Sequence, residues 1–215
     1  MTGWPACSSP HIGPIDAVVI SHDHWDHLDQ PTISAMTGWT GTTFVVPLWA
    51  GAHLERWGIP AARIRELDWW QSTPVGTLQL TSTPALHTSG RDPLHNDETL
   101  WSGWALAGPQ HRVWYSGDSG YFPDLAEIGT RLGPFDVTLI ESGQYDPAWP
   151  ANHLGPDSRS LAGQGNGLPG YWACRPAAIG SFGWSARCPT RPSVTSQCSE
   201  STISQSSVDT TTAPC

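Results

Sequence analysis

The densest group of potential metal ligands in this sequence follows a short apolar stretch. His22, His24, Asp26 and His27 lie within six consecutive positions, directly after the apolar run at 15–20. Imidazole and carboxylate are the ligands that a borderline cation such as zinc prefers. Without a metal, groups crowded in this way would repel and desolvate one another. We therefore predict a metal site for two ions. The alternative is a solvated histidine-rich turn, but tracts of this kind usually signal metal binding.

The elements around these residues must hold them in place. The run at 15–20 is typical of a buried strand that ends in a loop, and such a loop can aim several side chains at one point. A helix that Asp29 could cap follows it. We expect further strands at 42–47, 63–70, 75–81, 100–106, 112–115 and 136–140, and helices at 31–36, 50–57 and 122–132. We expect residues 63–70 and 75–81 to pair through a turn at 72–74. This alternation favours helices that cover stacked sheets.

The spacing His-x-His-x-Asp-His resembles the signature of the metallo-β-lactamase superfamily of two-zinc hydrolases. The wider segment Ile-Ser-His-Asp-His-Trp-Asp-His-Leu-Asp at 20–29 is similar to one branch, which contains the N-acyl-phosphatidylethanolamine-hydrolysing phospholipase D and its bacterial relatives. Residues 83–91, 114–121 and 141–153 resemble later motifs of that branch, in the same order. The resemblance runs from about residue 15 to 157. It implies an α/β fold, the αββα sandwich, with the metals at one edge and with both ends incomplete in this chain.

The resemblance also implies a role for each matched residue. It implies these metal ligands: His22, His24 and His87 for a first zinc, Asp26 and His27 for a second, and Asp118 as a bridge between them. Two zinc ions can share a hydroxide whose parent water has a pKa lowered to ~7, so no serine or cysteine nucleophile is needed. Asp26 would also orient that hydroxide. His153 would act in catalysis by contacting the substrate; the alternative is a surface role. The Asp118 motif, Ser-Gly-Asp-Ser-Gly, also suits a plain turn.

The implied function is zinc-dependent hydrolysis of a phosphodiester or related ester, phospholipase D-like or lactonase-like, through a metal-bound hydroxide. The expected partner is a small-molecule or phospholipid-like ester substrate. The family's last ligand is a histidine of a His-Trp-Gly motif, but no histidine follows His153 here. The second zinc site should therefore be weakened. Two alternatives stand beside the enzyme: a truncated fragment that binds at most one metal ion, and a metal-binding module without chemistry.

Changes in composition and periodicity along the sequence, together with the extent of the resemblance, predict three segments: a remnant leader at 1–14, a partial metallo-β-lactamase domain at 15–157, and a tail at 158–215. Residues 161–215 are rich in Ser, Thr, Gly, Pro and Cys and show no helical or strand periodicity, so they could bury little core. Four cysteines and Trp172 and Trp184 are unusual for a disordered tail. They favour an out-of-frame reading of a GC-rich gene, and a genuine disordered segment is the alternative.

Composition limits the partners and the compartment. The formal net charge is −9 and no basic cluster occurs, which argues against a nucleic-acid partner. The sequence contains no run of roughly 18 apolar residues, so we predict no membrane span. The first residues lack a secretory signal, so we expect a cytoplasmic protein. The five cysteines fit neither a zinc ribbon nor a disulfide framework. The remaining histidines, which we expect to be solvated, are His11, His53, His95 and His111.

Overall fold

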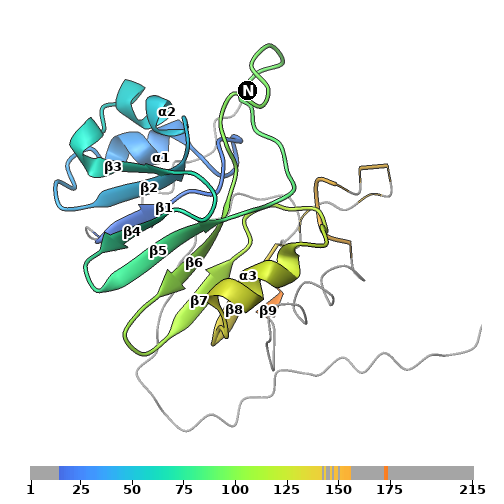
Figure 1. Ribbon diagram of the computed structural model, residues 1–215. Coiled ribbons are helices and arrows are strands. Elements are labelled where there is room, and N and C mark those ends of the chain that lie inside the picture. The colour runs from blue at the N-terminus through green and yellow to red at the C-terminus, as the bar shows by residue number, and fades with distance from the viewer. Residues whose placement is uncertain are drawn as a thin grey trace, which may run out of the picture. The chain divides into compact units, whose positions relative to one another are not determined.

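Two β-sheets form the centre of the structure (Figure 1), a computed structural model that describes residues 15–141, 143, 146, 148–149, 151–155 and 172–173. The smaller sheet contains three parallel strands, in the order β1 (Ala17–Val19), β2 (Thr43–Pro47) and β3 (Ile64–Leu67). The larger sheet contains, in order, β4 (Ser72–Val75), β5 (Leu78–Thr83), β6 (Gly103–Ala107), β7 (Arg112–Tyr115), β8 (Val137–Ile140) and β9 (Trp172–Ala173). Its strands are antiparallel from β4 to β7 and parallel from β7 to β9.

Helices cover the outer face of each sheet (Figure 1). Helices α1 (Gln30–Ala35) and α2 (Gly51–Arg56) pack on the smaller sheet, and a short 3-10 helix, Ala61–Arg63, leads into β3. Helix α3 (Leu125–Leu132) packs on the larger sheet. The Asp29 side chain accepts a hydrogen bond from the backbone N–H of Thr32, so the predicted cap of α1 is confirmed. Helix α3 begins three residues later than the predicted helix at 122–132.

The core consists of three apolar clusters, which follow from the alternation of side chains along the strands. In β2, Phe44 and Val46 pack against α1 and α2, while Val45 packs between the two sheets. Trp104 of β6 joins the same inter-sheet cluster, and the neighbouring Ala105 packs on the α3 side. The clusters therefore fill the three interfaces of a four-layer αββα sandwich, which confirms the predicted fold class.

One predicted pairing is wrong. Residues 63–70 do not pair with residues 75–81: β3 pairs in parallel with β2, and residues 72–75 form β4, which pairs with β5. The physical reason lies in β3, where Ile64 packs on the helix side and Leu67 packs between the sheets. A strand with apolar residues on both faces needs cover on both sides. In the smaller sheet, helices cover one face of β3 and the larger sheet covers the other. Pro74 fits β4 because β4 is an edge strand.

Two residues of the predicted tail, 172 and 173, belong to the described structure. Trp172–Ala173 form β9, which runs parallel to β8, a pairing that the sequence did not suggest. The rest of the segment at 158–215, except for these two residues, lies outside the described residues, and so does the predicted leader at 1–14. The predicted segment boundaries therefore stay predictions.

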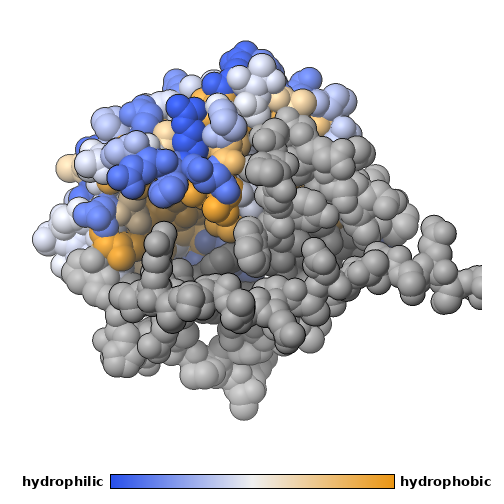
Figure 2. Space-filling view, turned by 90° about the horizontal axis from the view of Figure 1, so that it is seen from below, coloured by the Kyte–Doolittle hydropathy of each residue, from blue (hydrophilic) through white to orange (hydrophobic). Residues whose placement is uncertain are grey.

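The surface of the described residues is mixed in polarity. On the face shown in Figure 2, apolar residues gather between hydrophilic ones. Exposed large apolar side chains include Trp25, Trp49 and Leu94, and single residues of this kind are usual on protein surfaces. Among the helices that the structure describes, none combines the length and the apolar character needed to cross a membrane.

Candidate metal centre

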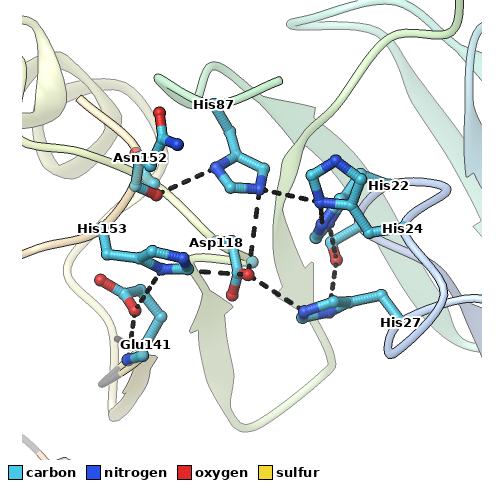
Figure 3. Close-up of polar contacts among 12 residues, drawn as sticks. His22, His24, His27, His87, Asp118, Glu141, Asn152 and His153 are labelled. Atoms are coloured by element: carbon cyan, nitrogen blue, oxygen red, sulfur yellow. Dashed lines mark hydrogen bonds and ion pairs between the residues drawn. The ribbon is translucent and has the colours of Figure 1, made fainter. Parts of the chain in front are cut away.

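Four loops meet at one edge of the sandwich, each after the carboxyl end of a strand (Figure 3). The loop after β1 carries the histidine motif at 22–27, and the loop after β5 carries His87. Asp118 follows β7, and Glu141 and His153 follow β8. Strand ends fix the backbone of each loop, so residues far apart in the sequence can converge on one point. The centre thus draws on both sheets.

The first ligand group consists of His22, His24 and His87, as predicted. The Nδ1 atom of His24 lies 2.9 Å from His22 Nε2 and 3.3 Å from His87 Nε2. Nitrogens that share one tetrahedral zinc lie roughly 3.3 Å apart, given Zn–N bonds of about 2.0 Å. The opposite nitrogens have partners of their own: His22 Nδ1 lies 3.0 Å from Ser21 Oγ, and His87 Nδ1 lies 2.9 Å from the carbonyl oxygen of Asn152. The Asn152 carbonyl oxygen can only accept, so it fixes the His87 tautomer that leaves Nε2 free for a metal, and the Ser21 hydroxyl can support the same tautomer of His22.

The second ligand group consists of His22, His27 and Asp118. His27 Nε2 lies 3.0 Å from Asp118 Oδ2, and the same oxygen lies 3.9 Å from His87 Nε2. The carboxylate therefore lies between the two groups, where a bridging ligand would be needed. Asp26 is less well placed: its side chain is 80% exposed, and its Oδ2 lies 3.5 Å from His27 Nε2. The structure brings together the predicted ligands apart from Asp26, which lies at the rim.

A third group, Asp118, Glu141 and His153, adjoins the second. His153 Nδ1 lies 3.2 Å from Glu141 Oε2 and 4.0 Å from Asp118 Oδ2. The buried Glu141 carboxylate also accepts hydrogen bonds from the backbone N–H groups of Gly143 and Leu154. His153 was predicted as a site residue, whereas Glu141, which begins the same family-like segment, was given no role. The available signal was a carboxylate placed directly after the buried strand at 137–140.

Burial and charge set the protonation states of the ligands. Burial, reinforced by the neighbouring histidines, lowers the pKa of His22 well below its usual value. Burial lowers the pKa of His87 to about 4. Burial raises the pKa of Asp118, but its hydrogen bond and charge interaction with His27 outweigh that effect and lower it. Near neutral pH the site therefore offers two neutral imidazoles and one carboxylate, the states that bind metal ions.

The pKa of His27 moves in the opposite direction. Burial lowers it, but the hydrogen bond and charge of Asp118 outweigh burial and raise it. In the absence of a metal, a protonated His27 pairs with the Asp118 carboxylate. A metal ion bound here would replace that proton.

Gly117 allows the Asp118 loop to approach the histidine motif. Its φ is +60°, in the left-handed region that side chains disfavour. A Cβ atom at this position would lie 2.8 Å from the Ser102 carbonyl oxygen and 2.8 Å from Ser21 Cβ. The residue before the predicted bridging ligand therefore has to be glycine for the loop to keep this path.

The other histidines differ from one another. His95 and His111 are exposed, as expected, and His11 lies outside the described residues. His53 departs from the expectation of a solvated side chain, because its Nε2 lies 3.2 Å from Oδ2 of the buried Asp23. The sequence offered no spacing signal for this pair, whose members are 30 residues apart.

Comparison with known proteins gives a family and several relatives. A family model described as "Beta-lactamase superfamily domain" matches residues 3–164. An uncharacterized protein of Mycobacterium tuberculosis is 47% identical over 165 residues, which cover 74% of this chain and 44% of the relative. The N-acyl-phosphatidylethanolamine-hydrolyzing phospholipase D 1 of Caenorhabditis elegans is 32% identical over 177 residues, 75% of this chain and 50% of the relative. A metal-dependent hydrolase of Pyrobaculum calidifontis is 31% identical over 127 residues, 59% of this chain and 52% of the relative. The chain thus spans about half the length of these relatives.

Solved structures show the same fold. Igni18, a metallo hydrolase from Ignicoccus hospitalis, aligns with a TM-score of 0.56 and 22% identity over 71% of this chain and 60% of its own. CmlA, a diiron β-hydroxylase from Streptomyces venezuelae, aligns with a TM-score of 0.62 and 17% identity over 80% of this chain and 39% of its own. At these identities the likeness concerns the fold alone. With the family match and the curated relatives, it leads to one conclusion: the chain belongs to the metallo-β-lactamase superfamily, in the family of the β-lactamase superfamily domain.

Proposed function

We propose that this chain is a zinc-dependent hydrolase that acts on a phosphodiester or related ester. The observation that carries the proposal is that two ligand groups adjoin: they share His22, and the Asp118 carboxylate of the second group lies 3.0 Å from His27 Nε2 and 3.9 Å from His87 Nε2 of the first. A single structural zinc would need only one closed set of four ligands, whereas two adjoining open groups are typical of two-metal hydrolytic sites. Relatives whose names state hydrolase activity support the same class of reaction.

The ligand types fit zinc. Imidazole nitrogens with one carboxylate suit zinc better than they suit calcium or magnesium, which prefer oxygen ligands. When bound, two zinc ions would supply positive charge that activates water and stabilises the charge that develops on the ester. His22, His24 and His87 would hold the first ion, and His27 and Asp118 the second. Asp26 lies at the rim, where its exposed carboxylate can accept a proton from an incoming water molecule.

His153 is suited to contacting an anionic substrate. The hydrogen bond to Glu141 raises the pKa of His153, as do the charges of Asp118 and Glu141, although burial opposes them. In the protonated ring, Nδ1–H donates to Glu141 Oε2, and Nε2–H can donate to a phosphate or ester oxygen. Glu141 thereby favours the protonated form of His153, which has a donor left for the substrate.

A phosphodiester assay tests the proposal. The full chain, loaded with zinc, should hydrolyse bis-p-nitrophenyl phosphate, and chelation should abolish turnover. His87→Ala should lower turnover by more than about 100-fold, because even partners of metal ligands usually contribute 10–100-fold. His95→Ala is the matched control, since His95 is exposed and absent from the ligand groups of the described residues. Turnover by the parent chain no faster than that of zinc in buffer would rule out the hydrolase proposal for this substrate class.

The second candidate is a chain that binds one metal ion and has no hydrolytic activity. It is favoured by one observation: the second ligand group shares His22 with the first, so among the described residues the two groups do not offer two independent sets of three ligands. The second ligand group of the described residues consists of the shared His22 with His27 and Asp118, and the exposed Asp26 lies 3.5 Å from His27. Measured zinc content separates the two candidates.

A further inference from the structure

The two loops that supply the first ligand group are also joined by contacts beside the ligands. Asp23 Oδ1 accepts a hydrogen bond from the backbone N–H of Gly90, at 2.7 Å. Arg91 Nη1 donates to the carbonyl oxygens of Asp23 and Leu28, at 2.7 and 2.6 Å. In the other direction, Trp25 Nε1 donates to the carbonyl oxygen of Arg91, at 2.9 Å. The backbone of each loop is thus bonded to a side chain of the other.

These contacts lie close to the ligands in the sequence. Asp23 stands between His22 and His24, and Gly90 follows His87 by three residues. Asp23 and Gly90 are 67 residues apart, so their hydrogen bond closes the space between two loops that the chain itself does not connect closely. A shift of either loop would change the separation of His22 and His24 from His87. The geometry of the first metal site therefore depends on how these loops are joined.

Asp23 is a buried carboxylate whose two oxygens both have hydrogen-bond partners outside the ligand groups. Its residue is 3% exposed, and its second oxygen, Oδ2, lies 3.2 Å from His53 Nε2 on α2. Burial raises its pKa, but the hydrogen bonds from His53 and Gly90 outweigh this and keep the carboxyl ionised. Burying a charge is costly unless the charge is paired and hydrogen-bonded. These partners account for the buried charge and fix the position of the loop.

Arg91 adds a stacked contact that holds the same interface. Its guanidinium carbon lies 4.0 Å from the centre of the Trp25 ring and 5.0 Å from that of Trp57. A planar guanidinium can stack on aromatic rings while its Nη1 donates two hydrogen bonds. Lysine does not provide this combination. Trp25 is 65% exposed, so burial alone does not explain its position. Its ring and its Nε1–H both contact Arg91.

We propose that Asp23, Trp25 and Arg91 form a clasp that positions His22 and His24 relative to His87 and so sets the metal affinity of the first site. These three are positioning residues, because they act through the ligands and do not belong to the ligand groups themselves. The inference rests on the metal-binding part of the proposed function and is independent of the substrate. Partners of this kind usually change metal affinity by 10–100-fold when they are removed.

The test compares zinc affinity among variants of the full chain, measured by competition with a chromophoric chelator. Asp23→Ala should weaken the tightest site by about 10–100-fold and change the visible absorption bands of the cobalt-substituted protein. Asp23→Asn should recover most of the affinity, since an amide oxygen can still accept from Gly90 and the amide can bond to either tautomer of His53. Glu98→Ala, on the same loop and exposed, removes the same charge without touching the clasp and should match the parent.

Near-ultraviolet circular dichroism of the metal-free proteins shows whether each variant keeps its fold. If Asp23→Ala does not fold, Arg91→Lys decides, because it keeps the charge but loses the planar stack, and it should also weaken zinc binding. A folded Asp23→Ala or Arg91→Lys variant with unchanged zinc affinity and unchanged cobalt bands would overturn the clasp. A parent chain that binds no zinc would instead overturn the metal centre itself, so the two failures are distinguishable.

Discussion

His87 is the ligand whose protonation state should be visible in the stability of the metal-free protein. It is 7% exposed, and burial lowers its pKa to about 4. Because this value lies below that of the unfolded chain, about 6.5, protons bind the unfolded state more readily. The stabilising contribution is complete above about pH 6.5 and is lost as the pH falls towards 4.

Urea unfolding of the metal-free parent and of His87→Gln, at about pH 7 and about pH 4, measures this effect. The free energy of unfolding of the parent should fall by about 3 kcal/mol more than that of the variant over this range, by linkage. The comparison with the variant removes the contributions of the other titrating groups. Parallel pH profiles for the two proteins would mean that His87 is not buried as a neutral imidazole.

Glu141 supports a second prediction for single residues. Its Oε2 accepts from Gly143 and lies against His153, while its Oε1 accepts from Leu154. Glu141→Gln offers only one acceptor oxygen, so a buried N–H loses its partner, which costs about 1–3 kcal/mol of unfolding free energy. NMR titration should also show a lower pKa for His153. Glu127→Gln, in an exposed pair with Arg131 on α3, is the control and should change stability by less than about 0.5 kcal/mol.

At the scale of elements, the loop between β7 and Asp118 depends on Gly117. Gly117→Ala would place a side chain at a φ of +60° and only 2.8 Å from a backbone carbonyl oxygen, which cannot rotate away. The left-handed conformation alone costs about 1–2 kcal/mol, and the contact adds to it. We expect thermal unfolding at lower temperature and weaker zinc binding. Gly38→Ala is the control, since a Cβ there meets nothing within 4 Å; equal effects of the two changes would contradict this account.

Helices and strands were predicted well where a capping residue or an apolar pattern marks them locally in the sequence. The Asp29 cap located α1, and the predicted strand at 112–115 agrees with β7. The predicted hairpin of residues 63–70 and 75–81 failed because pairing was judged from neighbourhood in the sequence, whereas β3 is placed by burial on both of its faces. The spacing of His22, His24 and His27 predicted that these side chains lie together, and the family resemblance added His87. Asp23 with His53, and Glu141 with His153, could not be predicted, because only the folded chain brings each pair together.

For the whole molecule, we expect two metal ions to bind with different affinities. The first group has three imidazoles, while the second has two, and one of these, His22, is shared with the first group. Zinc titration of the metal-free chain should therefore show one tight site and one weaker site. His27→Ala should remove the weaker site and leave the tight one, as read from competition with a chelator. Two sites of equal affinity would show that sharing His22 does not weaken the second site.

The placement of the ligands across both sheets has a mechanical consequence. His22 and His24 follow a strand of the smaller sheet, and His87 follows a strand of the larger one. The sheets also meet through an apolar cluster and through several hydrogen bonds, among them one from Trp104 Nε1 to the Ile20 carbonyl oxygen and one from the Ser102 N–H to the Ser21 carbonyl oxygen. An ion held by all three histidines is a cross-link between the two halves of the sandwich, and any ligand that binds only the folded state stabilises it by mass action. The ion would then also stabilise the contact between the two sheets, and the free energy of unfolding should rise with the concentration of free zinc.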